Sequence, residues 1–192
     1  MQPALRFMAV LLLLLPMGIS GCVSTTLQTD WKDPAFNSKF KKVLVICIVK
    51  EMVIRNTLED NLTAQFRQQG VDAVQSYTFF PALENMDKDV VRAKVREMGA
   101  DGVFLVRQTG KGTLELTPDI SSDLWNTFWV GSSAPQVNTV DFYRVETSLY
   151  EAAKGGIVWQ ALSETYDDDS LRKIVSNFAA LMVKKLGEQG LI

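Results

Sequence analysis

The sequence predicts an α/β (or α+β) domain in which a single mixed sheet of about five strands packs with three helices, in the order β-α-β-α-β-β-β-α. Residues 43–49 form an unbroken apolar run rich in β-branched side chains, typical of a strand buried on both faces of a sheet. Apolar residues then recur at helical spacing. Two strand-like runs, 140–150 and 157–166, favour a hairpin ahead of a last helix.

The first helix is predicted over residues 53–69, with Gly70 as its C-terminal cap. Its apolar face repeats every four positions, at Ile54, Leu58, Leu62 and Phe66. Arg55 and Glu59 are also four apart, and we expect them to form a solvated pair on the helix surface.

The next elements continue the alternation of strand and helix. Residues 71–77 indicate a second strand, and residues 102–106 a third. Between them, Asp87 is a plausible N-cap and Gly99 a stop signal for a second helix. This β-α-β-α-β order predicts parallel pairing of the three strands.

A long connection follows the third strand. The segment Gly110-Lys111-Gly112-Thr113 lacks the spacing of a phosphate-binding loop and is interpreted as a turn. Residues 113–139 form a 27-residue connection, and long connections tend to be functional or disordered. Two interpretations of its aromatic middle stay open: a lid or extra strand over the sheet, or a contact surface for a protein partner or the lipid interface. The contact residues would be Trp125, Phe128 and Trp129.

The C-terminal hairpin turns at Gly155-Gly156, and the last helix opens after residues 167–170 and runs through to Gly187. Three consecutive aspartates, 167–169, are explained by capping of that helix, because the glycine and distal glutamate of a calcium loop are missing.

The N-terminus predicts a lipid anchor. Residues 7–19 are an apolar run of 13, against the roughly 20 that a membrane-spanning helix needs. The tetrapeptide that closes this region resembles a bacterial lipobox, in which the cysteine is lipidated: Ile19, Ser20, Gly21 and Cys22. We therefore predict a signal peptide over 1–21, a lipidated N-terminus and tether over 22–38, and one domain over 39–192.

Composition excludes several classes of site. The chain has no histidine, which excludes a histidine general base, a Ser-His-Asp or Cys-His catalytic pair and nearly all common catalytic zinc sites. With 22 acidic and 20 basic residues it carries no basic bias toward nucleic acid. Cys47 lies within the apolar run and is predicted to be a buried free thiol.

Three acids, Asp101, Glu146 and Asp167, are candidates for carboxylate catalysis. They lie at the ends of predicted elements, where capping and solvation explain them without chemistry. We expect no catalytic residue, no metal site and no cofactor.

Several short motifs together resemble an uncharacterised family of bacterial envelope lipoproteins. They are the lipobox, a first strand of the type seen at 42–46, the Arg55…Glu59…Gly70 pattern, the segment 99–103 and the hairpin at 149–159. The architecture is similar to the small α/β domain of the TolB N-terminal and CsgG type. This resemblance implies binding of periplasmic partners and brings no catalytic residues. Pores of the CsgG type also need long hairpins, and the sequence predicts no pair of alternating strands of roughly 10 residues.

The function expected from these observations is that of a membrane-anchored lipoprotein, a non-catalytic binding or assembly module of the cell envelope. Its partners would be membrane lipid, through acylated Cys22, and an envelope protein or peptidoglycan. The alternatives are a subunit of an oligomeric secretion or transport assembly and a carboxylate-based hydrolase. Val23, where an aspartate would signal inner-membrane retention in enteric bacteria, favours the periplasmic face of the outer membrane.

Overall fold

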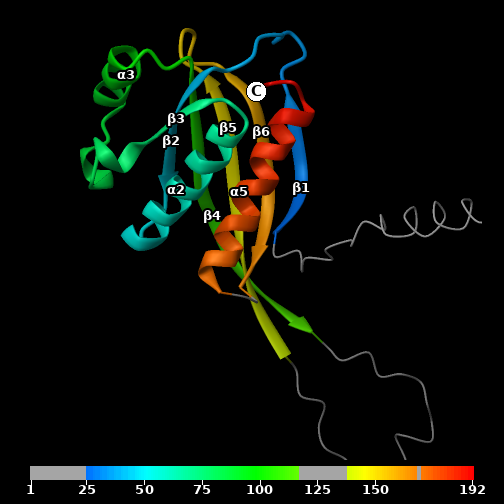
Figure 1. The fold of residues 1–192 in the computed structure, drawn as a ribbon. Helices are drawn as coiled ribbons and strands as arrows, with labels where there is room; N and C mark the ends of the chain where they lie inside the picture. Colours follow the sequence, from blue (N-terminus) through cyan, green and yellow to red (C-terminus); the bar gives the residue numbers. More distant parts are fainter. Residues whose placement is uncertain (1–24, 117–137, 168–169) are drawn as a thin grey trace, which may run out of the picture.

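The computed structural model describes residues 25–116, 138–167 and 170–192 (Figure 1). These residues form a six-stranded mixed sheet and three α-helices, which confirms the predicted fold class. The strands are β1 (Thr25–Lys32), β2 (Lys42–Ile48), β3 (Asp72–Gln75), β4 (Gly102–Leu116), β5 (Asn138–Glu151) and β6 (Ile157–Tyr166). The helices are α2 (Met52–Gln68), α3 (Lys88–Glu97) and α5 (Leu171–Glu188), with short 3₁₀ turns η1 (Ser76–Thr78) and η2 (Leu83–Asn85).

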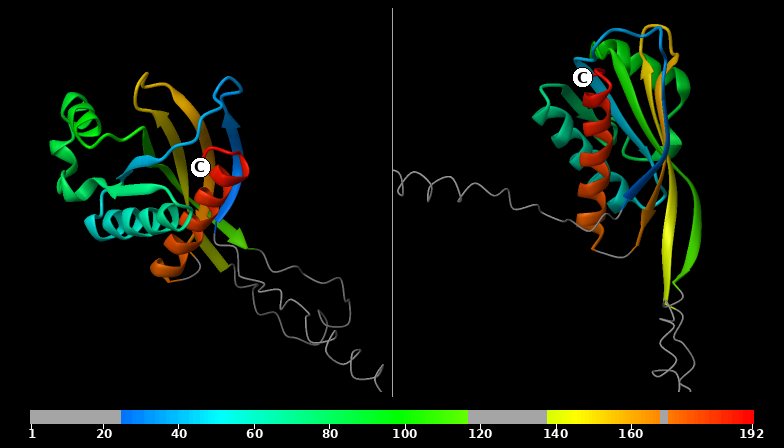
Figure 2. Two further views of the ribbon diagram at one scale, coloured as in Figure 1. Left: turned by 45° about the horizontal axis from the view of Figure 1, so that its top comes forward. Right: turned by 90° about the vertical axis from the view of Figure 1, so that its right-hand side faces the viewer.

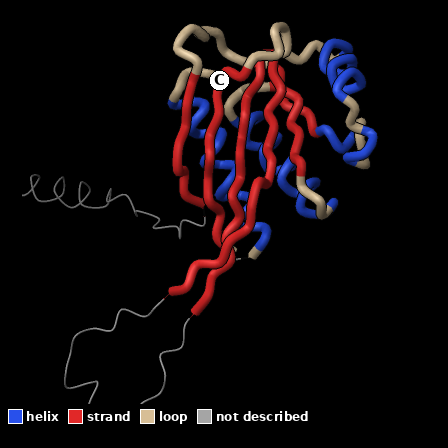
Figure 3. The backbone as a smooth tube through the Cα atoms, turned by 180° about the vertical axis from the view of Figure 1, so that it is seen from behind, coloured by secondary structure: helices blue, strands red, loops and turns tan. Residues whose placement is uncertain are grey.

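The sheet has the spatial order β1-β6-β5-β4-β2-β3. β2 pairs in parallel with β3 and β4, as the sequence predicts, and the other pairs are antiparallel. Helices α2 and α5 cover one face of the sheet (Figure 2). Helix α3 packs on the other face beside β2, and the rest of that face carries no helix of the described residues (Figure 3).

The apolar run in β2 contributes side chains to the hydrophobic clusters on both faces of the sheet. Val43, Val45 and Cys47 point into the core under α2 and α5, while Leu44 and Ile46 pack in the smaller cluster with α3. A strand buried on both faces needs such a continuous run. Cys47 is free and fully buried, as predicted, and burial together with the nearby Glu59 carboxylate raises the pKa of its thiol.

Interpreting residues 22–38 as a tether is wrong for Thr25–Lys32, which form β1 and pair antiparallel with β6. The Thr25 hydroxyl lies 3.1 Å from that of Thr165, and the bond is buried. The strand was missed because it is an edge strand whose polar side chains face solvent, so it lacks an apolar repeat. The folded domain therefore begins within three residues of Cys22.

The third predicted strand, 102–106, is too short: β4 runs to Leu116, and β5 pairs with it from Asn138. The turn predicted at residues 110–113 is also wrong. Gly112 lies in β4, where it pairs with Phe142 of β5. The ring of Phe142 crosses over it, and a Cβ at position 112 would come within 2.5 Å of the ring. A glycine covered by a cross-strand aromatic side chain is compatible with a continuous strand. The chain thus has the pair of long strands that the sequence did not predict.

Arg55 and Glu59 form a buried ion pair, which corrects the expected solvated pair. Their side chains are 2% and 0% exposed, and the Arg55 Nε to Glu59 Oε1 distance is 3.2 Å. The guanidinium also donates to the Ser76 hydroxyl at 3.0 Å and to the Phe80 carbonyl at 2.8 Å. The segment after β3 therefore folds over the first turns of α2 and excludes water from the pair.

The Glu59 carboxylate joins three elements. Its Oε1 accepts from the Cys47 backbone N–H at 3.0 Å, beyond the last β2–β3 pair, and from the Ser76 hydroxyl at 2.8 Å. Its Oε2 accepts from the Tyr77 N–H at 2.9 Å. One carboxylate thus satisfies polar groups at the end of β2 and in η1, and it holds α2 against both. The Tyr77 hydroxyl bonds to exposed Asp60, which raises the pKa of Tyr77 to about 12.

We predict that Glu59→Gln lowers the free energy of unfolding by about 3–5 kcal/mol, because it leaves the Arg55 charge buried without its partner. Urea titration of the full chain measures the change. Glu97→Gln is the matched control, because Glu97 pairs with Lys94 at the surface of α3, where about 0–1 kcal/mol is expected. Equal small losses in the two variants would contradict a structural role for the buried pair.

Candidate functional site

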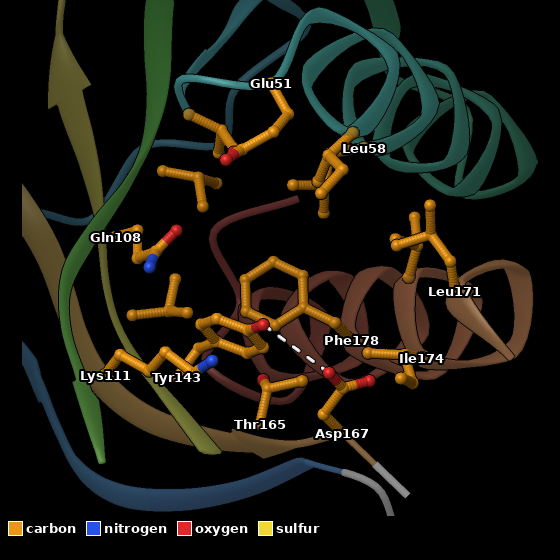
Figure 4. A pocket seen from close by; sticks show the side chains of 15 residues that line it. Glu51, Leu58, Gln108, Lys111, Tyr143, Thr165, Asp167, Leu171, Ile174 and Phe178 are labelled. Carbon is orange, nitrogen blue, oxygen red and sulfur yellow. Dashed lines mark hydrogen bonds between the residues drawn. The ribbon is translucent and has the colours of Figure 1, made fainter. Parts of the chain in front are cut away.

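A cavity lies where the sheet, α2 and α5 meet at one end of the domain (Figure 4). Its volume is about 490 Å³, within the range of ligand pockets. Nine of its lining side chains are apolar: Val49, Ile54, Leu58, Val106, Val145, Leu171, Ile174, Val175 and Phe178. The polar lining residues are Glu51, Gln108, Lys111, Tyr143, Thr165 and Asp167.

The topology explains why a cavity forms at this place. β2 ends at Ile48, opposite Arg107 of β4, and the chain then turns into α2 through Glu51. Helix α5 also begins here, at Leu171. Two helices therefore start beside the carboxyl end of a parallel strand, which is where ligand sites form in α/β sheets.

A polar rim borders the apolar lining. The Lys111 ammonium lies 2.7 Å from Asp141 and 5.6 Å from the ring centroid of Tyr143. The Lys111 hydrogen bond lowers the pKa of Asp141, assisted by the Thr113 hydroxyl, and the same bond raises the pKa of Lys111. The Tyr143 hydroxyl and the Asp167 carboxylate are 3.5 Å apart. An apolar lining with a charged rim suits the apolar part of an amphipathic partner.

The three candidate acids do not meet. Asp101 accepts hydrogen bonds from the backbone N–H groups of Lys41 and Lys42 at 2.8 and 3.0 Å and so fixes the entry to β2. Glu146 accepts from the Gln160 amide at 2.9 Å on the open face of the sheet. Asp167 lies at the cavity rim. Within the described residues, no group of three or more His, Cys, Asp or Glu side chains could hold a metal ion.

Strands β4 and β5 extend past the cavity as a two-stranded ribbon (Figures 1 and 2). β2 pairs with β4 only as far as Arg107, and β6 pairs with β5 only from Phe142. The ribbon continues for four more residue pairs, from Thr113↔Asp141 to Leu116↔Asn138, a rise of about 13 Å. Among the described residues, no other strand pairs with the outer edge of β4 or of β5 over these last four residue pairs.

The cavity and the base of the ribbon lie at the end of the domain where β1 begins. Thr25 pairs with Thr165, which lines the cavity, and the ribbon points away from the domain in the same direction (Figure 1). We call this end the anchor end: it comprises the start of β1, the carboxyl end of β2 and the first turns of α2 and α5. Cys22 precedes Thr25 by three residues, which span at most about 11 Å.

The predicted lipobox, Ile19 to Cys22, and the aromatic residues Trp125, Phe128 and Trp129 lie outside the described residues, as do Asp168 and Asp169. No helix among the described residues is long and apolar enough to cross a membrane. Sequence reasoning found none of the cavity residues as a group, because they come from five helices and strands and from the loops beside them, far apart in the chain. The alternation of glycine with polar residues at 110–113 was the available signal for the ribbon.

No model of a known protein family matches the chain, and the search of curated proteins finds no relative. Among solved structures, the PelC dodecamer from Paraburkholderia phytofirmans is similar, with 13% identity and a TM-score of 0.51, over 84% of this chain and 96% of PelC. A point variant of that dodecamer gives the same identity and TM-score over 98% of its chain. Lipoprotein GNA1162 from Neisseria meningitidis is 12% identical, with a TM-score of 0.45 over 77% of this chain and 99% of that one. At these identities, the likeness to PelC shows a shared fold and nothing further.

Proposed function

We propose that the protein is a lipid-anchored, non-catalytic assembly module of the cell envelope, held by acylated Cys22 at the periplasmic face of the outer membrane, and that its copies associate through the β4–β5 ribbon. The ribbon is the observation that carries this proposal. An isolated pair of strands is marginally stable in water, so its projection beyond the sheet favours a partner along its edges. Unpaired strand edges are templates for pairing with another chain.

The two edges of the ribbon differ, which favours a particular kind of assembly. One edge belongs to β4 and the other to β5, and we propose that the β4 edge of one copy pairs with the β5 edge of the next. Such contacts are heterologous, and they give a ring when the rotation between copies closes. PelC, which has a similar fold, is a dodecamer. That likeness supports an oligomer and leaves the number of copies open.

The anchor is supported by the short connection between Cys22 and the sheet. Because β1 begins at Thr25, an acyl group on Cys22 would hold the domain close to the bilayer. Stable anchoring needs two signals, such as two acyl chains, which bacterial lipidation supplies. Copies held at one surface would meet with their ribbons aligned.

We predict a disulfide between neighbouring copies when one carries Thr113→Cys in β4 and a differently tagged copy carries Thr139→Cys in β5. Both side chains are exposed on the ribbon, so substitution leaves the core unchanged. The native Cys47 is buried and would not compete. Mild oxidation of cells that express both full-length chains, followed by detection of a dimer carrying both tags, measures the pairing.

Val90→Cys on α3, 50% exposed and away from the ribbon, replaces Thr113→Cys in the matched control. The control pair should give no dimer carrying both tags. Equal yields from the two pairs, or no dimer from the ribbon pair, would contradict edge-to-edge association.

A further inference from the structure

We propose that the anchor end docks directly on the bilayer that holds the acylated Cys22, through an apolar contact face formed by Met52, Val53 and Leu171. This inference rests on the lipid anchor of the proposed function and adds the orientation of the domain. The partner is the lipid surface itself. Three kinds of observation support it: exposure, helix-start chemistry and chain length.

The contact face is exposed although its residues are large and apolar. Val53 is 72% exposed, Met52 62% and Leu171 41%. These residues come from the first turns of α2 and α5. Leu171 lines the cavity itself, and Met52 and Val53 directly precede Ile54, which also lines it. Exposed apolar side chains gathered at one place mark a contact site.

The first turns of both helices depart from usual N-terminal chemistry. Neither α2 nor α5 has an acidic residue in its first turn, where the helix dipole favours one. Exposed Arg172 follows Leu171 in the first turn of α5, and exposed Lys50 precedes Glu51, the N-cap of α2. Glu51 and Asp167 are the acidic groups at the cavity. A first turn without a carboxylate can enter the headgroup region of a bilayer without burying a negative charge.

The short chain between Cys22 and β1 would keep the contact face close to the membrane. Two residues, Val23 and Ser24, join Cys22 to Thr25, so the acylated residue lies within about 11 Å of β1. The Thr25 hydroxyl is bonded to Thr165, which lines the cavity. In Figure 4 the blue ribbon of β1 passes beside Thr165 and Asp167. A bilayer that holds the acyl chains therefore lies within reach of the contact face.

The end of the β4–β5 ribbon would lie deeper in the bilayer than the contact face. The ribbon runs past the contact face for its last four residue pairs, so its end would enter the same lipid layer, with its edges paired between neighbouring copies. Leu114, which is 43% exposed on the ribbon, would then lie deeper in lipid than Val53. Helix α3 lies toward the opposite end of the domain and would face water (Figure 1).

Spin labels on the full-length lipidated chain test the orientation. Single variants Val53→Cys, Leu171→Cys, Leu114→Cys and Val90→Cys are labelled and reconstituted into vesicles of phosphatidylethanolamine and phosphatidylglycerol. Val90, an exposed valine on α3, is the matched control for Val53. We expect the ratio of oxygen to nickel-complex accessibility to be several-fold higher at positions 53 and 171 than at 90, and highest at 114.

Each other outcome overturns the proposal in a distinct way. Labels at 53 and 171 that are as accessible to the nickel complex as the label at 90 would show that the face lies in water. Labels shielded from both reagents would show that protein covers the face. A label at 114 in lipid with 53 and 171 in water would leave the contact to the ribbon alone. The mass of each chain is measured before reconstitution: an unmodified Cys22 refutes the anchor itself, whereas an acylated Cys22 with labels in water refutes only the docking.

Discussion

The buried ion pair between Arg55 and Glu59 determines the shape of the anchor end. Glu59 accepts from the backbone of Cys47 at the end of β2, and Arg55 donates to the segment that follows η1. The first turns of α2 are thereby fixed to the sheet, and Ile54 and Leu58 are held at the cavity. Such a pair adds little net stability over an apolar replacement, but breaking it is costly, so it specifies one arrangement of these elements.

That arrangement places three features at the same end of the domain. The cavity, the projecting ribbon and the first residue of β1 are joined through cross-strand pairs, since Thr25 pairs with Thr165 and Tyr143 pairs with the same residue. An N-terminal lipid, an exposed apolar face and a ribbon with open edges would then act on one surface. In the proposed arrangement, anchoring would restrict the copies to a plane and align them, which would raise their effective concentration for pairing.

Much of the fold was predictable because its signals are local. The apolar run from Val43 predicts a central strand, and Gly70 and Gly99 end their helices with positive φ angles of 82° and 65°. β1 and the outer half of β4 were not predictable from apolar patterns, because one is a polar edge strand and the other projects beyond the core. Burial of Arg55 and Glu59 was missed because it depends on a later segment, which includes Ser76 and Phe80, folding over the helix.

Native mass spectrometry of the full-length protein, extracted from membranes in mild detergent, tests the account most directly, since one spectrum reports both the modification and the assembly. We predict a subunit that begins at Cys22 and carries the mass of at least two acyl chains, within a homo-oligomer of a single defined copy number. A subunit that retains residues 1–21, or an acylated chain that remains a monomer at every concentration, would contradict it.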